Sequence, residues 1–310
     1  MIDRNAKIYI AGHTGMVGKA VCQLLRERGY RNLLLKSEAE LDLREQDKTE
    51  KLFQEQRPDY VLLFAAKVGG IKANINYPAD FLYDNIMIEA NIIQRSYKYK
   101  VKKLLYLGSS CIYPRNCLQP MKEECLLSGE LEPTNEGYAL AKIVGLKLCQ
   151  YYNQQFATNF ICLIPCNLYG INDNFDLDSS HVIPALIRKF HEGKINQKPD
   201  VTVWGSGKAR REFLFVDDLA DACLYFMDCY NGKEVINVGP GEDILMSELV
   251  FLIKDIVGYR GRVVFDSTQP EGMPRKLLDV GRLKKLGWKP KTKLEDGIKI
   301  TYEWYCRAYG

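Results

Sequence analysis

The sequence predicts an α/β protein in which a Rossmann-type, doubly wound parallel sheet is followed by a smaller C-terminal lobe. Two observations support this fold class. Short runs that are almost wholly apolar alternate with longer stretches whose apolar residues recur every three or four positions. Strands of that kind are buried on both faces, and the stretches between them are crossover helices. In addition, a glycine-rich turn follows the first apolar run directly, as the first turn of such sheets does.

The first 170 residues contain the regular part of this pattern. The expected strands cover residues 7–12, 32–36, 59–66, 102–110 and 159–170. The expected helices between them cover residues 16–29, 46–56, 78–99 and 136–156. Because each helix returns the chain to the same edge of the sheet, neighbouring strands run parallel. We therefore expect residues 1–170 to form a dinucleotide-binding domain.

The remaining residues, 171–310, are less regular. Apolar or amphipathic segments occur at 180–193, 201–205, 211–229, 234–239, 246–258, 263–266 and 294–309. We expect some of them to return to the sheet, and the others to form a substrate-binding lobe over its carboxyl edge. The chain has neither a low-complexity linker nor an internal repeat, so the two lobes should pack together with a cleft between them.

Composition narrows the classes of function. A formal charge of +4 on 310 residues is too small to predict nucleic-acid binding. No run of eighteen apolar residues predicts a membrane span, and the first residues lack the apolar core of a signal peptide. Ten scattered cysteines without a CxxC pair, and only three histidines, favour reduced thiols and no metal site. We expect a cytoplasmic protein.

The glycine-rich turn predicts a dinucleotide site. Gly12, Gly15 and Gly18 lie between the first strand and the first helix, where glycine permits a tight turn and a close approach to pyrophosphate. Their spacing resembles that of the short-chain dehydrogenases/reductases. After the second strand, Lys36 stands where an NAD-binding protein usually has an acid. A cation there suits a 2′-phosphate and favours NADPH, unless Lys36 is an ordinary solvated lysine.

Three residues predict the chemistry of carbonyl reduction. Ser109 ends the fourth strand at the carboxyl edge, and Tyr138 and Lys142 lie four apart on one helix face. Ser109 can hydrogen-bond a carbonyl oxygen, which Tyr138 can protonate. We expect the ammonium of Lys142 to lower the pKa of the Tyr138 phenol and to hold the nicotinamide ribose. A hydride from the cofactor would complete the reduction.

A wider set of motifs gives a narrower resemblance. These motifs occur in order along nearly the whole chain: GHTGMVG, AAKVGGIKAN, YPADFLYDNIMIEANII, LGSSCIYP, NEGYALAK, NLYG, DNF, SHVIPALIRKFHE, VWGSG, RREFLFVDDLA and PRKLLDV. Together they resemble the GDP-L-fucose synthase family of extended short-chain dehydrogenases/reductases. The resemblance implies an enzyme that epimerises the carbons flanking the ketone of a GDP-4-keto-6-deoxy sugar and reduces that ketone with NADPH.

The resemblance also implies roles for Cys111 and His181 as the acid and base of epimerisation. Protons next to a ketone are acidic, and Ser109 and Tyr138 could stabilise the resulting enolate. A thiol and an imidazole are suited to moving such protons near neutral pH. Two simpler interpretations stay open: Cys111 is a small buried residue at a strand end, and His181 is a surface residue at a helix start.

The binding residues also follow from the resemblance. The cofactor contacts that it implies are Gly12, Thr14, Gly15, Met16, Val17, Gly18, Lys36, Asp42, Leu43, Ala65, Ala66, Lys142, Pro165, Asn167, Leu168 and His181. The implied contacts to the GDP sugar are Asn167, Val182, Lys189, Trp204, Arg211 and Lys276. Trp204 could stack on guanine, and Lys189 and Arg211 could neutralise the diphosphate. Lys189 could equally be a solvated lysine, and Trp204 a packing residue.

Some residues depart from the family's pattern. Thr14 and Lys189 stand where arginine is frequent, the His-Pro that usually follows DNF is missing, and Met273 replaces a smaller polar residue. These departures leave open a related enzyme that only reduces C4 of a GDP-4-keto-6-deoxy-heptose. A 4,6-dehydratase usually has Asp-Glu, whose acids eliminate water, where this chain has Ser110 and Cys111, so we do not expect dehydration. A non-enzymatic NADPH sensor usually loses the tyrosine or the lysine, and this chain has both.

Relatives of this kind pair through two long helices, which correspond here to residues 77–98 and 136–155. We therefore expect a homodimer. The apolar face through Phe81, Ile86, Ile88 and Ile92 is compatible with that interface, although it could equally cover the sheet.

Overall fold

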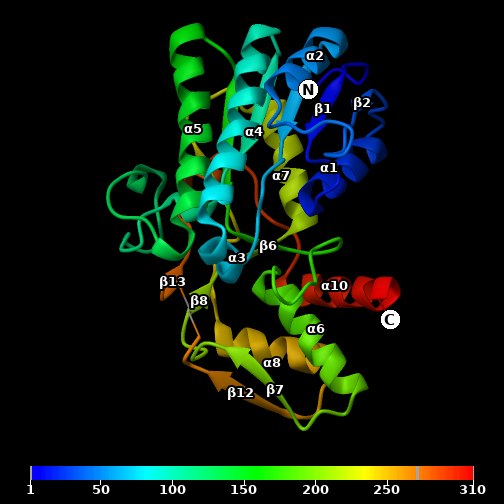
Figure 1. Cartoon of the computed structure of the whole chain (residues 1–310), viewed down its shortest axis with the longest axis vertical. Helices are drawn as coiled ribbons and strands as arrows, with labels where there is room; N and C mark the ends of the chain where they lie inside the picture. Colours follow the sequence, from blue (N-terminus) through cyan, green and yellow to red (C-terminus); the bar gives the residue numbers. More distant parts are fainter. Residues whose placement is uncertain (1, 270–271, 310) are drawn as a thin grey trace.

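The computed structural model describes residues 2–269 and 272–309 (Figure 1). Its main sheet has six parallel strands in the order β10-β5-β4-β3-β1-β2. Their bounds are β1 Ile8–Ala11, β2 Leu33–Leu34, β3 Tyr60–Leu63, β4 Lys103–Leu107, β5 Phe160–Pro165 and β10 Ile236–Val238. The chain moves outward from β1 to β2 and then crosses to β3, so the switch point where such sheets bind ligands lies at β1 and β3. This order confirms the predicted doubly wound fold.

The helices around this sheet form two packed groups. One group contains α2 (Gln46–Gln56), α4 (Pro78–Lys98) and α5 (Glu136–Phe156), and Figure 1 shows α4 and α5 side by side. The other contains α1 (Met16–Glu27) and α7 (Val216–Cys229), which pack on each other. The crossover through α1 leads from β1 to β2, away from β3, so it passes over the opposite face of the sheet from α4 and α5. The helix α7, which follows β9 of the second lobe, packs beside α1.

The strands are buried because helices cover both faces. All four residues of β1 and all five of β4 are buried, so neither strand shows a polar face. The helix α1 is amphipathic, and its buried residues include Val21 and Leu25. The short helix α9 (Gly281–Lys285) packs near β10.

The second lobe has its own small core beneath the carboxyl edge of the sheet. Its strands are β6 Asn167–Tyr169, β7 Asp200–Trp204, β8 Arg210–Arg211, β9 Phe213–Phe215, β11 Ile244–Leu245, β12 Arg262–Asp266 and β13 Arg275–Lys276. Its helices are α6 Val182–Ile195, α8 Met246–Val257 and α10 Leu294–Tyr309, seen in the lower half of Figure 1. Their core is rich in aromatic residues, and Phe190 and Ile253 within it are fully buried.

Short elements lie between the strands and helices of the first lobe. They are the helix α3 (Ile71–Asn76) and the 3-10 turns η1 (Ser110–Ile112), η2 (Glu123–Cys125) and η3 (Pro133–Asn135). The turn η1 follows β4 directly, and η3 leads into α5. These turns therefore place the ends of the SSC and GYALAK segments near each other, as α5 also contacts η1.

The structure departs from the expected elements in two places. The run 159–170 is not one strand: it divides at Cys166 into β5 in the main sheet and β6, which pairs with β9 in the second lobe. The segment 211–229 contains a strand and the helix α7. As expected, part of the later chain returns to the sheet, because β10 pairs with β5. Within the described residues, every helix is too short or too polar to cross a lipid bilayer.

Candidate active site

The glycine-rich turn leaves room for a ligand at the switch point. A Cβ at Gly18 would lie 2.1 Å from the carbonyl oxygen of Gly12, so the helix and the turn touch there without side chains. Gly12 has a φ of +90°, and a Cβ on it would lie 2.5 Å from the Ala65 nitrogen. A Cβ at Gly15 would instead meet only ordinary contact, so packing does not require this glycine. The turn through Gly12, Gly15 and Gly18, which we call the cradle, therefore fits the pyrophosphate of a dinucleotide.

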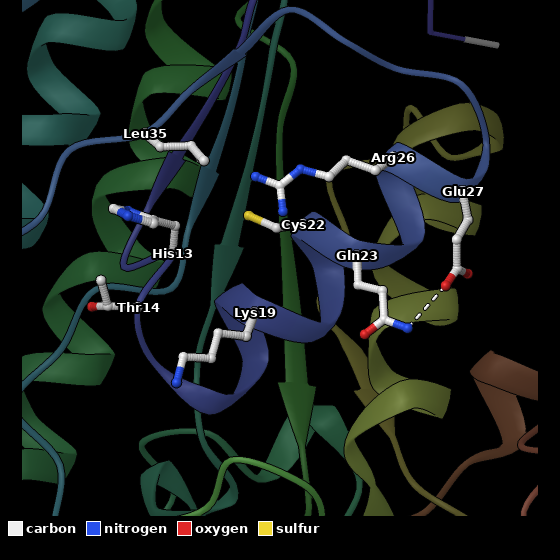
Figure 2. Close-up of a pocket in the computed structure, with 8 residues that line it drawn as sticks. All are labelled: His13, Thr14, Lys19, Cys22, Gln23, Arg26, Glu27 and Leu35. Atoms are coloured by element: carbon white, nitrogen blue, oxygen red, sulfur yellow. Dashed lines mark hydrogen bonds between the residues drawn. The ribbon is translucent and has the colours of Figure 1, made fainter.

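A pocket of about 460 Å³ lies beside this turn, along α1 (Figure 2). Figure 2 shows His13 and Thr14 on the turn, with Cys22 and Arg26 on α1 and Leu35 after β2. The predicted 2′-phosphate residue, Lys36, directly follows Leu35 and pairs with Glu40 at 3.1 Å. This pocket therefore borders the adenosine end of the predicted cofactor site.

The other predicted cofactor residues lie at the carboxyl ends of neighbouring strands. Ala65 and Ala66 follow β3, and the nitrogen of Ala65 donates to the carbonyl of Ala11 at the end of β1. Pro165 ends β5, while Asn167 and Leu168 belong to β6. Asp42 and Leu43 lie between β2 and α2, where the Asp42 carboxylate accepts from both Nε and Nη2 of the Arg44 guanidinium. Sheet topology thus brings these residues to one edge.

Ser109 and Tyr138 meet at the same edge. Ser109 is the N-cap of η1, where its hydroxyl accepts from the Cys111 nitrogen at 3.3 Å. Its side chain also hydrogen-bonds Tyr138 from α5. The Tyr138 ring packs edge-on against Phe81, with ring centroids 6.3 Å apart. Packing against Phe81 therefore fixes the Tyr138 ring, and the Tyr138 hydroxyl lies beside the Ser109 side chain.

Lys142 lies one helical turn beyond Tyr138, as predicted, but its charge is already paired. Its Nζ lies 3.0 Å from Glu89 Oε1 on α4 and donates to the carbonyl of Leu107 at 3.2 Å. Both side chains are almost completely buried. The Tyr106 hydroxyl donates to Glu89 at 2.9 Å, and a Cβ on Gly145 would lie 2.5 Å from Glu89 Oε2. A buried ion pair therefore holds α4, β4 and α5 together.

The predicted effect of Lys142 on Tyr138 is wrong in this structure. Burial raises the pKa of the Tyr138 phenol, the charges of Cys111 and Glu89 raise it further, and the Ser109 hydrogen bond lowers it only in part. The ammonium lies 5.9 Å from the Tyr138 ring, and Glu89 neutralises much of its field. The phenol is consequently held protonated, which is the form that can give a proton to a ketone oxygen.

Cys111 has three polar neighbours. Asn135 Nδ2 and Lys276 Nζ each lie 3.2 Å from its Sγ, and the Ser109 side chain also hydrogen-bonds the sulfur. Burial by itself raises the pKa of the thiol. The charge of Lys276 and the hydrogen bonds outweigh burial, so the pKa lies below the ordinary value. Cys111 is thus more than a small apolar residue at a strand end.

His181 is the N-cap residue of α6, and its side chain makes no capping hydrogen bond. The residue is exposed to solvent, yet protein atoms crowd its ring on several sides. That crowding, followed by the charge of Lys276, lowers the pKa of His181. Lys276 therefore acts on both residues that the resemblance assigns to epimerisation.

The residues predicted to bind GDP form two groups. Lys189 on α6 lies 5.9 Å from the Trp204 ring and donates to the carbonyl of Thr202 at 3.1 Å. Trp204 is 48% exposed at the end of β7, so its ring does not fill a core. Arg211 on β8 is instead paired in register with Lys276 on β13. Val182 begins α6 beside His181, and Asn167 Nδ2 donates to the carbonyl of Glu212 at 2.8 Å.

Sequence reasoning missed several polar residues of this region. Glu89 is a lone carboxylate in an apolar helical stretch, and Asn135 precedes the GYALAK segment by two positions. A buried acid between apolar neighbours is a signal that could have identified Glu89. Asp173, in the loop between β6 and α6, is a third polar residue that sequence reasoning missed, and it is buried. Burial raises the pKa of its carboxyl to about 7, because only the Asn174 nitrogen donates to it, at 2.7 Å.

Asp173→Asn should flatten the pH dependence of stability. A pKa raised above that of the unfolded chain means that the fold favours the protonated acid. That contribution is present at acidic pH and is lost as pH rises through about 7. At pH 8 the asparagine variant should exceed the parent's free energy of unfolding by about 2–4 kcal/mol. Urea unfolding at pH 5 and pH 8 measures this difference. Asp178→Asn, at an exposed position in the same loop, is the control, and identical pH profiles for Asp173→Asn and the parent would refute the expectation.

Comparison with known proteins places this geometry in a family. Residues 8–239 match the NAD dependent epimerase/dehydratase family. The chain is 52% identical to GDP-L-fucose synthase 1 of Arabidopsis thaliana over 99% of its own length and 95% of the relative's. The chain belongs to the GDP-L-fucose synthase family. The resemblance inferred from the motifs is therefore confirmed.

Solved structures show that the similarity in fold covers the whole chain. A GDP-L-fucose synthetase from Naegleria fowleri bound to NADP has a TM-score of 0.93 and 31% identity, covering 100% of this chain and 95% of the other. A GDP-6-OMe-4-keto-L-xylo-heptose reductase from C. jejuni has a TM-score of 0.94 and 41% identity, covering 99% of each chain. The whole chain, including the second lobe, thus has the architecture of nucleotide-sugar enzymes.

Proposed function

We propose that this chain is an NADPH-dependent enzyme that epimerises C3 and C5 of a GDP-4-keto-6-deoxy-mannose and then reduces its C4 ketone, giving GDP-L-fucose. One observation supports the coupling of the two reactions. The Ser109 side chain hydrogen-bonds both Tyr138, the predicted proton donor of reduction, and Cys111, a predicted residue of epimerisation. One carbonyl-binding position therefore serves both steps, since each needs charge stabilised on the same oxygen.

The cofactor would be held by the cradle at the switch point. The turn through Gly12, Gly15 and Gly18 receives the pyrophosphate, Lys36 pairs with a 2′-phosphate, and Lys142 reaches the nicotinamide ribose. When bound, NADPH supplies the hydride that reaches the ketone carbon. The NADP-bound relative from Naegleria fowleri supports this choice of cofactor.

The chain's own residues control the protons and the charge on oxygen. Ser109 donates a hydrogen bond to the ketone oxygen, and Tyr138 gives its proton to that oxygen during reduction. During epimerisation the same two hydroxyls stabilise the enolate oxygen, while Cys111 and His181 exchange protons with the neighbouring carbons. Lys142 keeps its place through Glu89 and so fixes the helix face that carries Tyr138.

The nucleotide end of the substrate would lie against the second lobe. The exposed ring of Trp204 offers a face for guanine, and Lys189 beside it and Arg211 on β8 offer cations for the diphosphate. On this basis residues 1–170, with the later segments that return to the sheet, bind the cofactor. Residues 171–310 mainly bind the GDP sugar.

A homodimer and a cytoplasmic location belong to the same proposal. Ile92 is buried in the core of the main sheet, and Phe81 is buried against Tyr138, so neither side chain is free for an interface. Other apolar side chains of α4 and α5 are exposed and would form the interface: Tyr83, Leu140, Val144 and Tyr151. Sedimentation equilibrium would measure the dimer, and a monomer at all concentrations would contradict it.

All ten cysteines are unpaired, which is consistent with a reducing compartment.

Deuterium incorporation tests the coupled reaction. The protein is incubated with GDP-4-keto-6-deoxy-mannose in deuterated water, first without and then with NADPH. Deuterium should enter C3 and C5 before reduction, and GDP-L-fucose should form only after NADPH is added. Cys111→Ala is the matched control, which should reduce without exchange. NADPH oxidation by the parent without any exchange would leave only the reductase.

A reductase of a GDP-4-keto-6-deoxy-heptose is the second candidate. It is favoured by the likeness to the heptose reductase from C. jejuni and by the departures in the DNF segment and at Met273. Met273 is buried, so a larger side chain occupies space that a small polar residue would leave open. The same experiment with the heptose substrate distinguishes the two, because a reductase of this class would prefer the heptose and leave C3 and C5 unlabelled.

A further inference from the structure

We propose that Lys276 is a positioning residue that keeps Cys111 as a thiolate, so that Cys111 is the proton acceptor of epimerisation. The family resemblance implied that Lys276 contacts the GDP sugar, whereas its Nζ lies 3.2 Å from the Cys111 sulfur. This inference rests on the proposed function for its chemistry. Its first test needs neither substrate nor cofactor.

The hydrogen bonds around the sulfur point to a thiolate. Lys276 Nζ and Asn135 Nδ2 are both donors, and each lies 3.2 Å from Sγ. The Ser109 side chain adds a further hydrogen bond that favours the charged form. A neutral thiol is a weak acceptor with one proton of its own to give, whereas a thiolate accepts several donors. The environment is therefore built for negative charge on sulfur.

Other ionisable groups around Cys111 do not compensate this charge. Tyr138 on α5 faces the thiol, and the protonated phenol is neutral. His181 at the start of α6 feels the Lys276 charge, which favours the neutral imidazole. Cys166, after β5, also feels Lys276 and is deeply buried. Among the residues that the structure describes, Lys276 is therefore the cation in contact with the sulfur.

The backbone around Lys276 holds the ammonium in place. The strand β13 pairs with β8, with Lys276 opposite Arg211. The next residue, Leu277, donates its nitrogen to Gln119 Oε1 at 2.9 Å, and its carbonyl accepts from the Met121 nitrogen at 2.8 Å. These bonds join β13 to the loop that follows Cys111. The distance between lysine and sulfur thus depends on main-chain pairing rather than on a free surface side chain.

This arrangement assigns directions to the proton transfers. The Cys111 thiolate takes a proton from the carbon next to the ketone and becomes a thiol, and the electron pair of that C–H bond forms the enolate. Ser109 and Tyr138 hydrogen-bond the enolate oxygen. His181, neutral at rest, takes up a proton from solvent, gives it to the opposite face of the carbon and returns to neutral imidazole. The ketone reforms with inverted configuration, and solvent resets the two side chains.

The charge state of Cys111 can be measured in the substrate-free protein. The rate of alkylation by iodoacetamide is followed against pH, and mass spectrometry quantifies the peptide that contains Cys111. The parent should react with a midpoint below the usual thiol value of ~8.5. Lys276→Met should move the midpoint upward by about one pH unit or more and slow alkylation at pH 7 by about tenfold.

Matched variants separate charge from structure. Lys276→Arg keeps the cation and should stay near the parent, while Lys285→Met, at an exposed lysine of α9, should leave the profile unchanged. Asn135→Asp places a carboxylate beside the sulfur and should also raise the midpoint, which keeps the test available if Lys276→Met folds poorly. A Lys276→Met profile that coincides with the parent's would overturn the proposal.

Exchange with solvent provides the second measurement. In deuterated water without NADPH, Lys276→Met should lose about tenfold in C3 and C5 labelling at pH 7, recover at high pH, and keep the parent's substrate KM. A raised KM with an unchanged alkylation profile would overturn the proposal and return Lys276 to nucleotide binding. Failure of the proposed function would give a different result from failure of this inference. The parent itself would then show no labelling, while Lys276→Met would still shift the alkylation midpoint.

Discussion

Tyr138→Phe is expected to lower the turnover of NADPH-dependent reduction by about 10³-fold, the usual scale for losing a general acid. The substitution removes the hydroxyl that gives its proton to the ketone oxygen. It keeps the ring that packs edge-on against Phe81, so the fold should be unaffected. Single-turnover oxidation of NADPH measures the chemical step, and calorimetric titration with GDP measures nucleotide binding, which should be retained.

The matched control for this variant is Tyr83→Phe, which removes a phenolic hydroxyl at a position of α4 that is 63% exposed. It should reduce at the parent's rate. A Tyr138→Phe turnover within a few-fold of the parent's would reject the assignment of Tyr138 as the proton donor. Because burial raises the pKa of this phenol, the parent's reduction should show no loss of activity from phenol ionisation near neutral pH.

Glu89→Gln is expected to lower the free energy of unfolding by about 3–5 kcal/mol, since it removes one partner of a buried ion pair. The variant leaves Lys142 in a site where both side chains are almost completely buried. Burial raises the pKa of the Glu89 carboxyl, while the charge of Lys142 and the hydrogen bonds from Lys142 and Tyr106 oppose that shift. Urea unfolding at neutral pH measures the loss.

A double variant distinguishes the lost pair from a general packing defect. Glu89→Gln combined with Lys142→Met removes both charges and should regain most of the stability, although it should not reduce ketones. If the single variant lost less than about 1 kcal/mol, as exposed pairs do, the pair would have no structural importance. Equal losses in the single and double variants would attribute the effect to packing.

The sequence was informative wherever a residue's role depended on its immediate neighbours. The alternation of buried strands and amphipathic helices predicted the sheet, and the turn through Gly12 and Gly18 predicted the cradle. The spacing of Tyr138 and Lys142 also placed them correctly on one face of α5, because four residues make about one helical turn. The break at Cys166 was not predicted, since apolar residues continue beyond it as far as Tyr169 and it is the partner strands that separate β5 from β6.

By itself, the sequence of this protein determined the fold class, the family and the identity of the groups that can react, because these follow from short-range periodicity and from the order of motifs. Only the tertiary structure decided how those groups are charged. Glu89 comes from a different helix than Lys142, and Lys276 comes from a strand far along the chain from Cys111. Protonation depends on distances between charges and on burial, and folding sets both by bringing remote segments together.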